Sequence, residues 1–262
     1  MKRIIAVLFF GVILFSCSSD DNPESPQQQQ IMFFPLSANS YWTFDNDSEA
    51  GVSRDSIYVE GTQLLNNKTF TNLDALPPVT GFMTQLVVDN LVHYTGSQLL
   101  VDGALSSPII DGFPALSIDL DEFILLDADV STPGTILSSI SGEITEVIMD
   151  IPLVFDYELK SVHSSLTTSG TGNGSIETKL VLTLSVAAEI NVAGIIISIP
   201  VLASQDVMVA TNTFAENIGL EASNILIEYE LEDLSGTGIE IPIPSQGTST
   251  ATQQLDAYFI GG

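Results

Sequence analysis

The chain has 262 residues, with 33 acidic against six basic side chains and a formal net charge of −27. An electrostatic field of this sign repels nucleic acid and anionic lipid headgroups, so nucleic-acid binding is excluded as a function. Cys17 is the only cysteine, which rules out an internal disulfide and a cysteine-ligated zinc site, so stability must come from a core drawn from the 45% of residues that are hydrophobic.

The first 17 residues have the layout of a bacterial lipoprotein signal. Met1-Lys2-Arg3 is positively charged, and the apolar run from Ile4 to Phe15 is too short to span a bilayer, which takes about 20 residues. Leu14-Phe15-Ser16-Cys17 resembles the lipobox of lipoproteins, with an aliphatic residue at −3 and a small residue before the cysteine. We therefore predict a signal peptide over residues 1–16, cleavage between Ser16 and Cys17, and attachment of lipid, including palmitate, to Cys17.

Residues 17–30 follow as a predicted disordered tether, acidic at its start and rich in glutamine toward its end. Ser18-Ser19-Asp20-Asp21-Asn22 resembles the export signal that follows the modified cysteine in Bacteroidetes lipoproteins. That resemblance implies a lipid-anchored protein on the outer membrane, facing the cell exterior. Pro23 to Gln30 contains nothing large and apolar that a fold could bury, which is typical of disorder.

Residues 31–262 indicate a single all-β domain with at most one or two short helices. Apolar and polar residues alternate with period two through this region, which is typical of strands with one buried face. The first hairpin candidates have turns at Asn66-Asn67-Lys68 and at Asp89-Asn90, the second lying between Leu86–Val88 and Leu91–Tyr94. Thr135–Met149 is the best helix candidate because its isoleucines fall near helical spacing, although Gly142 weakens it.

The second half of the domain gives the clearest strand patterns. Alternation marks Phe155–Lys160 and, after a flexible turn at Gly170–Gly174, a long strand from Lys179 to Val192. Ala193-Gly194 favours a hairpin into the next strand, where Pro200 predicts a bulge, an edge or a strand end because it has no amide hydrogen. Later strands are predicted at Ile225–Glu232 and Leu255–Phe259. The fold class is therefore mainly β, a curved antiparallel sheet as a half-barrel or sandwich.

Three motifs resemble a broad group of uncharacterised Bacteroidetes lipoproteins. Phe34-Pro35-Leu36 with Asn39–Phe44 looks like that group's entry into a tryptophan-containing first strand. Ser56–Val59 with Asn67–Phe70 looks like its next strand and turn, and Phe214–Leu220 like a late turn. The resemblance implies a cellular address and a strongly curved sheet. It implies no activity.

No motif for catalysis, a cofactor or a metal stands out, and we predict none of the three. His93 and His163 lie outside any G-x-S-x-G or H-E-x-x-H pattern. Two acidic clusters, Asp119–Asp129 and Asp45–Gly51, lack the spacing of a calcium loop and are better interpreted as solvated loops that hold calcium only loosely. Asp55-Ser56-Ile57 resembles a Bacteroidetes O-glycosylation site, which makes Ser56 a candidate for modification.

These observations favour a non-enzymatic, surface-displayed lipoprotein whose sheet binds a glycan or another envelope protein. Two alternatives stay open. A long curved sheet could cup acyl chains, as in lipid carriers like LolA and LolB. A pair of carboxylates could hydrolyse glycosides, since their separation depends on the fold. The carrier differs from the binding module in having an open apolar concave face instead of one filled by its own side chains.

Overall fold

The computed structural model describes residues 31–107, 110, 112–167, 174–239, 241 and 243–262. The predicted signal peptide, Cys17, the tether and most of the glycine-rich turn at Gly170–Gly174 lie outside the described residues. Within this part of the chain, no helix is long and apolar enough to cross a membrane.

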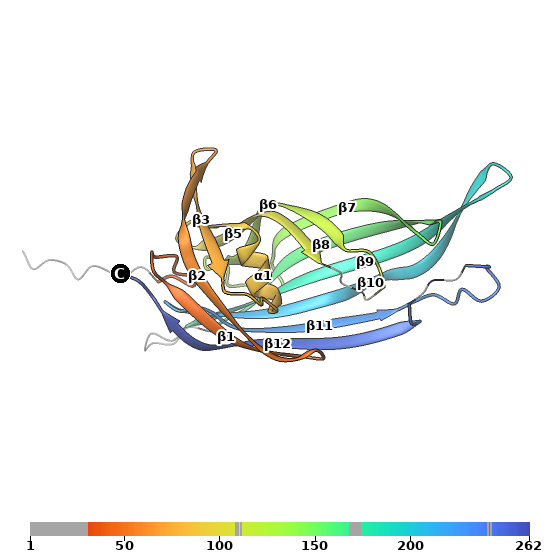
Figure 1. Ribbon diagram of the computed structural model, residues 1–262. Coiled ribbons are helices and arrows are strands. Elements are labelled where there is room, and N and C mark those ends of the chain that lie inside the picture. Colours follow the sequence, from red (N-terminus) through yellow and green to blue (C-terminus); the bar gives the residue numbers. More distant parts are fainter. Residues whose placement is uncertain (1–30, 108–109, 111, 168–173, 240, 242) are drawn as a thin grey trace, which may run out of the picture. The chain divides into compact units, whose positions relative to one another are not determined.

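In the described residues, 12 strands form one antiparallel sheet that curves until it nearly closes on itself, so the prediction of a mainly β fold is confirmed (Figure 1). The strand order is β6-β5-β4-β3-β2-β1-β12-β11-β10-β9-β8-β7. The strands are β1 (Tyr41–Ser48), β2 (Gly51–Leu65), β3 (Lys68–Ala75), β4 (Leu91–Tyr94), β5 (Gln98–Ser107), β6 (Leu116–Asp127), β7 (Ile136–Ile148), β8 (Ile151–Thr167), β9 (Ser175–Val192), β10 (Ile195–Ala215), β11 (Gly219–Glu230) and β12 (Gln246–Phe259).

This order divides the sheet into two meanders of six strands, β1 to β6 and β7 to β12. Strands within each meander pair with their neighbours in the sequence. The two meanders join where β1 pairs with β12, with Asn46 opposite Gln253. The two edge strands β6 and β7 approach each other on the other side of the curve, where side-chain hydroxyls make contacts between the edges. Ser138 Oγ accepts the Ile124 amide hydrogen at 3.0 Å, and Ser161 Oγ on β8 donates to the Leu125 carbonyl at 3.2 Å.

Two of the predicted hairpin turns are confirmed. Asn66-Asn67 joins β2 to β3 and Ala193-Gly194 joins β9 to β10, and all four residues have positive φ angles. Turns of this kind match the right-handed twist of the strands they connect, which is why asparagine and glycine occur there. The bulge predicted at Pro200 is also confirmed, because the β9–β10 register shifts between Pro200 and Leu202.

Two predictions of local structure are wrong. Thr135–Met149 forms strand β7 instead of a helix, and Gly142 lies where the Tyr157 ring of β8 leaves no room for a Cβ. The predicted hairpin around Asp89-Asn90 is a helix, α1 (Phe82–Val88), followed by β4. Tertiary packing decides α1, since Met83, Leu86 and Val87 are buried at helical spacing against the sheet.

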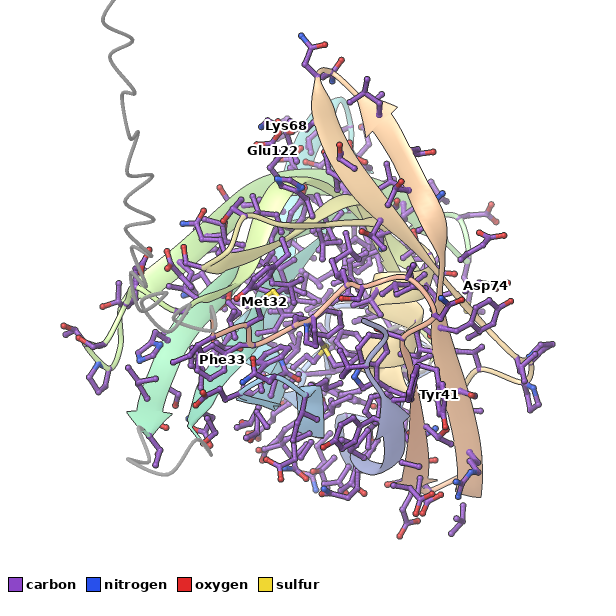
Figure 2. The ribbon with its side chains drawn as sticks, turned by 90° about the vertical axis from the view of Figure 1, so that its left-hand side faces the viewer. Met32, Phe33, Tyr41, Lys68, Asp74 and Glu122 are labelled. Carbon is purple, nitrogen blue, oxygen red and sulfur yellow. The ribbon has the colours of Figure 1, made fainter. Side chains whose placement is uncertain are left out.

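The inside of the sheet is filled by its own side chains. Figure 2 looks in from the end where Met32 and Phe33 lie and shows this interior crowded with sticks. At that end Phe34 stacks on Trp42, with ring centroids 5.6 Å apart. Elsewhere in the core, Phe113 meets the Phe155 ring edge-on at 5.4 Å. The largest fully buried side chains include Trp42, Phe44, Phe123, Phe155 and Phe214.

Candidate functional site

A row of polar side chains crosses this apolar interior. Each of its six residues lies directly opposite the next one on the neighbouring strand, from β8 through β9, β10, β11 and β12 to β1. All six are buried, with at most 6% of the residue exposed. We call this set the polar row: His163, Thr178, Asn212, Ser223, Gln253 and Asn46.

The polar row carries every buried side-chain nitrogen or oxygen found without a hydrogen-bond partner in the described part of the chain. These atoms are Asn46 Oδ1, Gln253 Oε1, Ser223 Oγ, Asn212 Oδ1 and both ring nitrogens of His163. An unsatisfied buried polar group costs about 1–3 kcal/mol, whereas a domain's whole net stability is about 5–15 kcal/mol. Six such groups therefore require partners that the described polypeptide does not supply.

A pocket opens onto the β12–β1 end of the polar row. Its volume is about 310 Å³, and Asn46 and Gln253 are among the residues that line it. Met208 and Ile225 form an apolar wall of the pocket, and Glu49 in the β1–β2 turn also lines it. We call this hollow the mouth pocket. It lies at the join between the two meanders.

Helix α1 and the residues before it hold one side of the mouth pocket in place. The buried carboxylate of Asp55 on β2 accepts the amide hydrogens of Thr80 at 3.0 Å and Gly81 at 2.7 Å. Gly81 is needed because a Cβ there would lie 2.7 Å from Asp55 Oδ2 and 2.8 Å from Gln253 Oε1. The beginning of α1 is therefore fixed against β2 and β12.

The same contacts orient the two pocket amides. Asn46 Nδ2 donates to Thr80 Oγ1 at 3.0 Å, and Gln253 Nε2 donates to Thr84 Oγ1 at 2.6 Å. Each amide nitrogen is thus engaged by α1 or the residues before it, while each amide oxygen stays without a partner. Both amide oxygens are buried from solvent, so an O–H or N–H group of a ligand bonds to them only if the side chains that cover them move aside.

The described lining contains acids and hydroxyls but no histidine, cysteine, lysine or arginine. The acids at its rim, Asp47 and Glu49, disfavour anionic ligands by charge repulsion. A hydroxyl nucleophile needs an adjacent base to activate it, and these lining residues supply no histidine or lysine for that role. The arrangement is suited to holding a molecule that carries hydrogen-bond donors.

A larger hollow of about 1270 Å³ lies under the segment between β11 and β12. Its lining includes Gln205, whose amide bonds to both the amide hydrogen and the carbonyl of Glu230 at 3.0 and 2.9 Å. Since that amide is already satisfied within the protein, this hollow lacks the unpartnered groups of the mouth pocket.

The two histidines lie on different strands and do not form a common site. His93 on β4 contacts the Thr69 carbonyl through Nδ1 at 2.7 Å and packs at a tilt on Phe70. His163 on β8 ends the polar row, and burial lowers its pKa while the Asp127 carboxylate opposes that shift.

The first acidic cluster, Asp119–Asp129, is spread along β6 and the residues after it. Asp119 and Asp121 are exposed, and Glu122 forms an ion pair with Lys68 (Figure 2). Asp127 accepts a hydrogen bond from Gln98 Nε2 at 2.7 Å. Across the described residues, no three His, Cys, Asp or Glu side chains are grouped so that they could hold a metal ion.

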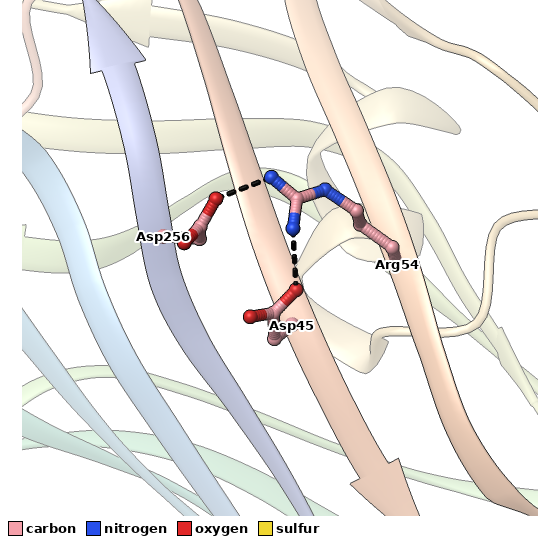
Figure 3. A network of polar contacts seen from close by, with 3 residues as sticks. All are labelled: Asp45, Arg54 and Asp256. Carbon is pink, nitrogen blue, oxygen red and sulfur yellow. Dashed lines mark hydrogen bonds and ion pairs between the residues drawn. The ribbon is translucent and has the colours of Figure 1, made fainter.

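The second cluster, Asp45–Gly51, is the β1–β2 hairpin and not a calcium loop. Arg54 on β2 pairs with Asp45 on β1, at 2.9 Å, and reaches across β1 to Asp256 on β12 (Figure 3). The hydrogen bond that Arg54 donates to the Asp256 carboxylate is the main cause of the raised pKa of the Arg54 guanidinium. All three side chains are about half exposed, and exposed ion pairs of this kind contribute little to stability.

Ser56, the candidate for O-glycosylation, lies between two inward-facing residues of β2, so its side chain is on the outer side of the sheet. Its modification stays a prediction.

Asp55, its neighbour in the motif, has a structural role that sequence reasoning missed. Sequence reasoning also missed the polar row. The signal available in the sequence was that each member is a polar residue at an otherwise apolar position of an alternating strand.

Comparisons with known proteins give little further information. No family model matches the sequence, and no curated protein matches it significantly. One matching solved structure is described as a "putative lipoprotein" from Parabacteroides distasonis ATCC 8503; it is 9% identical, with 88% of this chain and 100% of that chain covered. Its TM-score is 0.33, so the match carries no argument about fold, ligand or activity.

Proposed function

We propose that the chain is a lipid-anchored lipoprotein of the outer membrane, displayed toward the cell exterior, that binds a ligand without converting it. The lipobox-like residues ending at Cys17 support the anchor, and the acidic segment Ser18–Asn22 supports the address. The filled interior supports a binding module over a carrier, because a carrier of acyl chains needs an open apolar cavity and here Phe123, Phe155 and Phe214 occupy the inside.

We infer that the ligand is a neutral glycan unit and that it binds in the mouth pocket. The observation that carries this inference is that Asn46 and Gln253 line the pocket beside an apolar wall while their amide oxygens, buried from solvent, lack partners. A sugar reaches these oxygens if the side chains that cover them move aside. Sugar hydroxyls donate hydrogen bonds, and sugar C–H faces pack on apolar side chains. A volume near 310 Å³ lies at the lower end of the usual 300–1,000 Å³ range for ligand pockets, which suits one or two sugar rings.

Glycoside hydrolysis has weaker support at this site. Such an enzyme needs two carboxyl groups flanking the bond it cleaves, one of them able to donate a proton. The buried carboxylate nearest the pocket, that of Asp55, already accepts two backbone amide hydrogens and lies 3.3 Å from Thr80 Oγ1, a third donor. The two acids of the pocket lining, Asp47 and Glu49, are exposed on the β1–β2 hairpin.

The test screens mature lipidated protein in detergent against a glycan array and then measures affinity for each hit by calorimetry. Gln253→Leu and Asn46→Leu each remove one acceptor while keeping similar volume, and affinity should fall about 10-fold or more, as expected for a lost hydrogen bond of about 1–3 kcal/mol. Gln254→Leu, on the exposed side of β12, is the matched control and should bind normally.

Circular dichroism of each variant checks that the fold survives. Equal affinity of the Gln253→Leu, Asn46→Leu and control proteins would place the ligand elsewhere. Release of sugar from the same glycans would instead favour the hydrolase, and capture of an envelope protein without any glycan hit would favour a protein partner.

A further inference from the structure

The polar row continues past the mouth pocket into the interior. Ser223, Asn212, Thr178 and His163 follow Gln253 on successive strands, and each is at most 1% exposed. Four of the unpartnered atoms belong to Ser223, Asn212 and His163. No ligand of the mouth pocket could reach them without displacing core side chains, so they need a much smaller partner.

The layers of inward-facing side chains on the two sides of the row differ in size. In the next inward-facing layer toward the β1–β2 turn, the small side chains of Ser161, Ala210 and Ala251 alternate with those of Leu180 and Ile225. In the layer on the other side, Phe214 lies opposite Leu220, and Phe44 lies opposite Leu255. The row is therefore bounded by large apolar residues on one side and by several short side chains on the other.

The spacing of the row matches the reach of a water molecule. Neighbouring strands lie about 4.8 Å apart, and a single water that makes two hydrogen bonds of about 2.8 Å can bridge groups at that separation. Buried waters make two to four hydrogen bonds to polar groups that are otherwise unsatisfied. From Gln253 to His163 the row runs amide, hydroxyl, amide, hydroxyl, imidazole, and each of these groups can both donate and accept a hydrogen bond.

We propose that the polar row binds a string of ordered water molecules that runs from the mouth pocket to His163. Each water bridges side chains on adjacent strands, and together they satisfy the unpartnered atoms of Ser223, Asn212 and His163. The interior of the sheet thus contains a hydrated strip between two apolar layers. This proposal does not depend on what the mouth pocket binds.

A crystal structure of the mature protein at about 1.2 Å resolution tests the proposal, because ordered waters are visible at that level. We expect waters within about 3.2 Å of a His163 ring nitrogen, Asn212 Oδ1 and Ser223 Oγ. The proposal is overturned if these atoms contact only protein atoms or lie in dry space.

A measurement in solution uses the same wild-type protein and needs no variant to fold. Magnetisation transfer in NMR from long-lived bound water should reach the amide protons of residues 212 and 223, and its absence there would also count against the proposal. Ser223→Ala should lose at least one of these waters, whereas Asn224→Ala, on the exposed side of β11, should lose none. Sugar soaked into the crystals should displace water only at Asn46 and Gln253, so failure to bind sugar leaves this test intact.

Discussion

Replacement of Asp55 by alanine should be one of the most damaging single changes in the protein. The side chain is completely buried and accepts the amide hydrogens of Thr80 and Gly81. A hydrogen bond to a charged group contributes about 1.5–3 kcal/mol, so the loss of both bonds should lower the free energy of unfolding by about 3–6 kcal/mol. Asp55→Asn keeps one acceptor oxygen and should cost roughly half as much.

Urea denaturation of a fragment spanning residues 31–262, followed by far-ultraviolet circular dichroism, measures this change. Asp119→Ala, on the exposed face of β6, is the control and should change stability by no more than about 0.5 kcal/mol. Hydrogen exchange should show that the Asp55→Ala protein loses protection first in α1. A loss below about 1 kcal/mol would refute the reasoning, because it would mean that Asp55 does not hold the beginning of α1.

The remaining predictions concern the anchor, the buried histidine and the end of α1. Cys17→Ala should abolish metabolic labelling with a palmitate analogue, and label that persists would contradict lipidation at this residue. Burial lowers the pKa of His163 below its ordinary value of 6.5, so between the two pKa values the unfolded chain binds more protons than the folded chain. The contribution of His163 to stability is therefore full above pH 6.5 and is lost as the pH falls toward the folded-state pKa. His163→Leu should weaken this dependence in thermal melts at about pH 7.5 and pH 5.5, and an unchanged pH dependence would count against it. Asn90→Ala should lower the free energy of unfolding, measured by urea denaturation, by about 1–3 kcal/mol. The reason is that Asn90 donates to the Leu86 carbonyl at 2.8 Å and accepts from the Ala104 amide at 2.6 Å. A negligible change would show that these bonds do not stabilise the end of α1.

Local sequence signals predicted much of the sheet. The long alternation that begins at Lys179 lies within β9, and the residues Asn66-Asn67 and Ala193-Gly194 adopt the backbone angles that tight hairpins need. These features depend on neighbours in the sequence, so they are readable without the fold. Helix α1 was missed because its seven residues are too few to show a helical period. Its beginning is fixed by a distant residue, Asp55, and Asn90 after its end bonds to Ala104 on β5.

The polar row could not be predicted for a different reason. Each member reads as a single polar residue inside an apolar alternation, which is a common feature of strands. Only the register of strands far apart in the sequence places Gln253 opposite both Ser223 and Asn46. Register is a property of the whole sheet, and a shift of one residue would turn each of these side chains to the outer face.

The join between β1 and β12 has a consequence for how the protein is made. On the proposed export route the N-terminus crosses the membrane first, so β1 would wait without its β12 partner until the last strand of the sheet had been translocated. The mouth pocket draws residues from both strands, among them Asn46 and Gln253. A chain that ends before Gln246 would therefore contain one sheet of six strands and one of five, with exposed edges and no mouth pocket. Under the proposed surface display, only molecules that include β12 would present the pocket outside the cell.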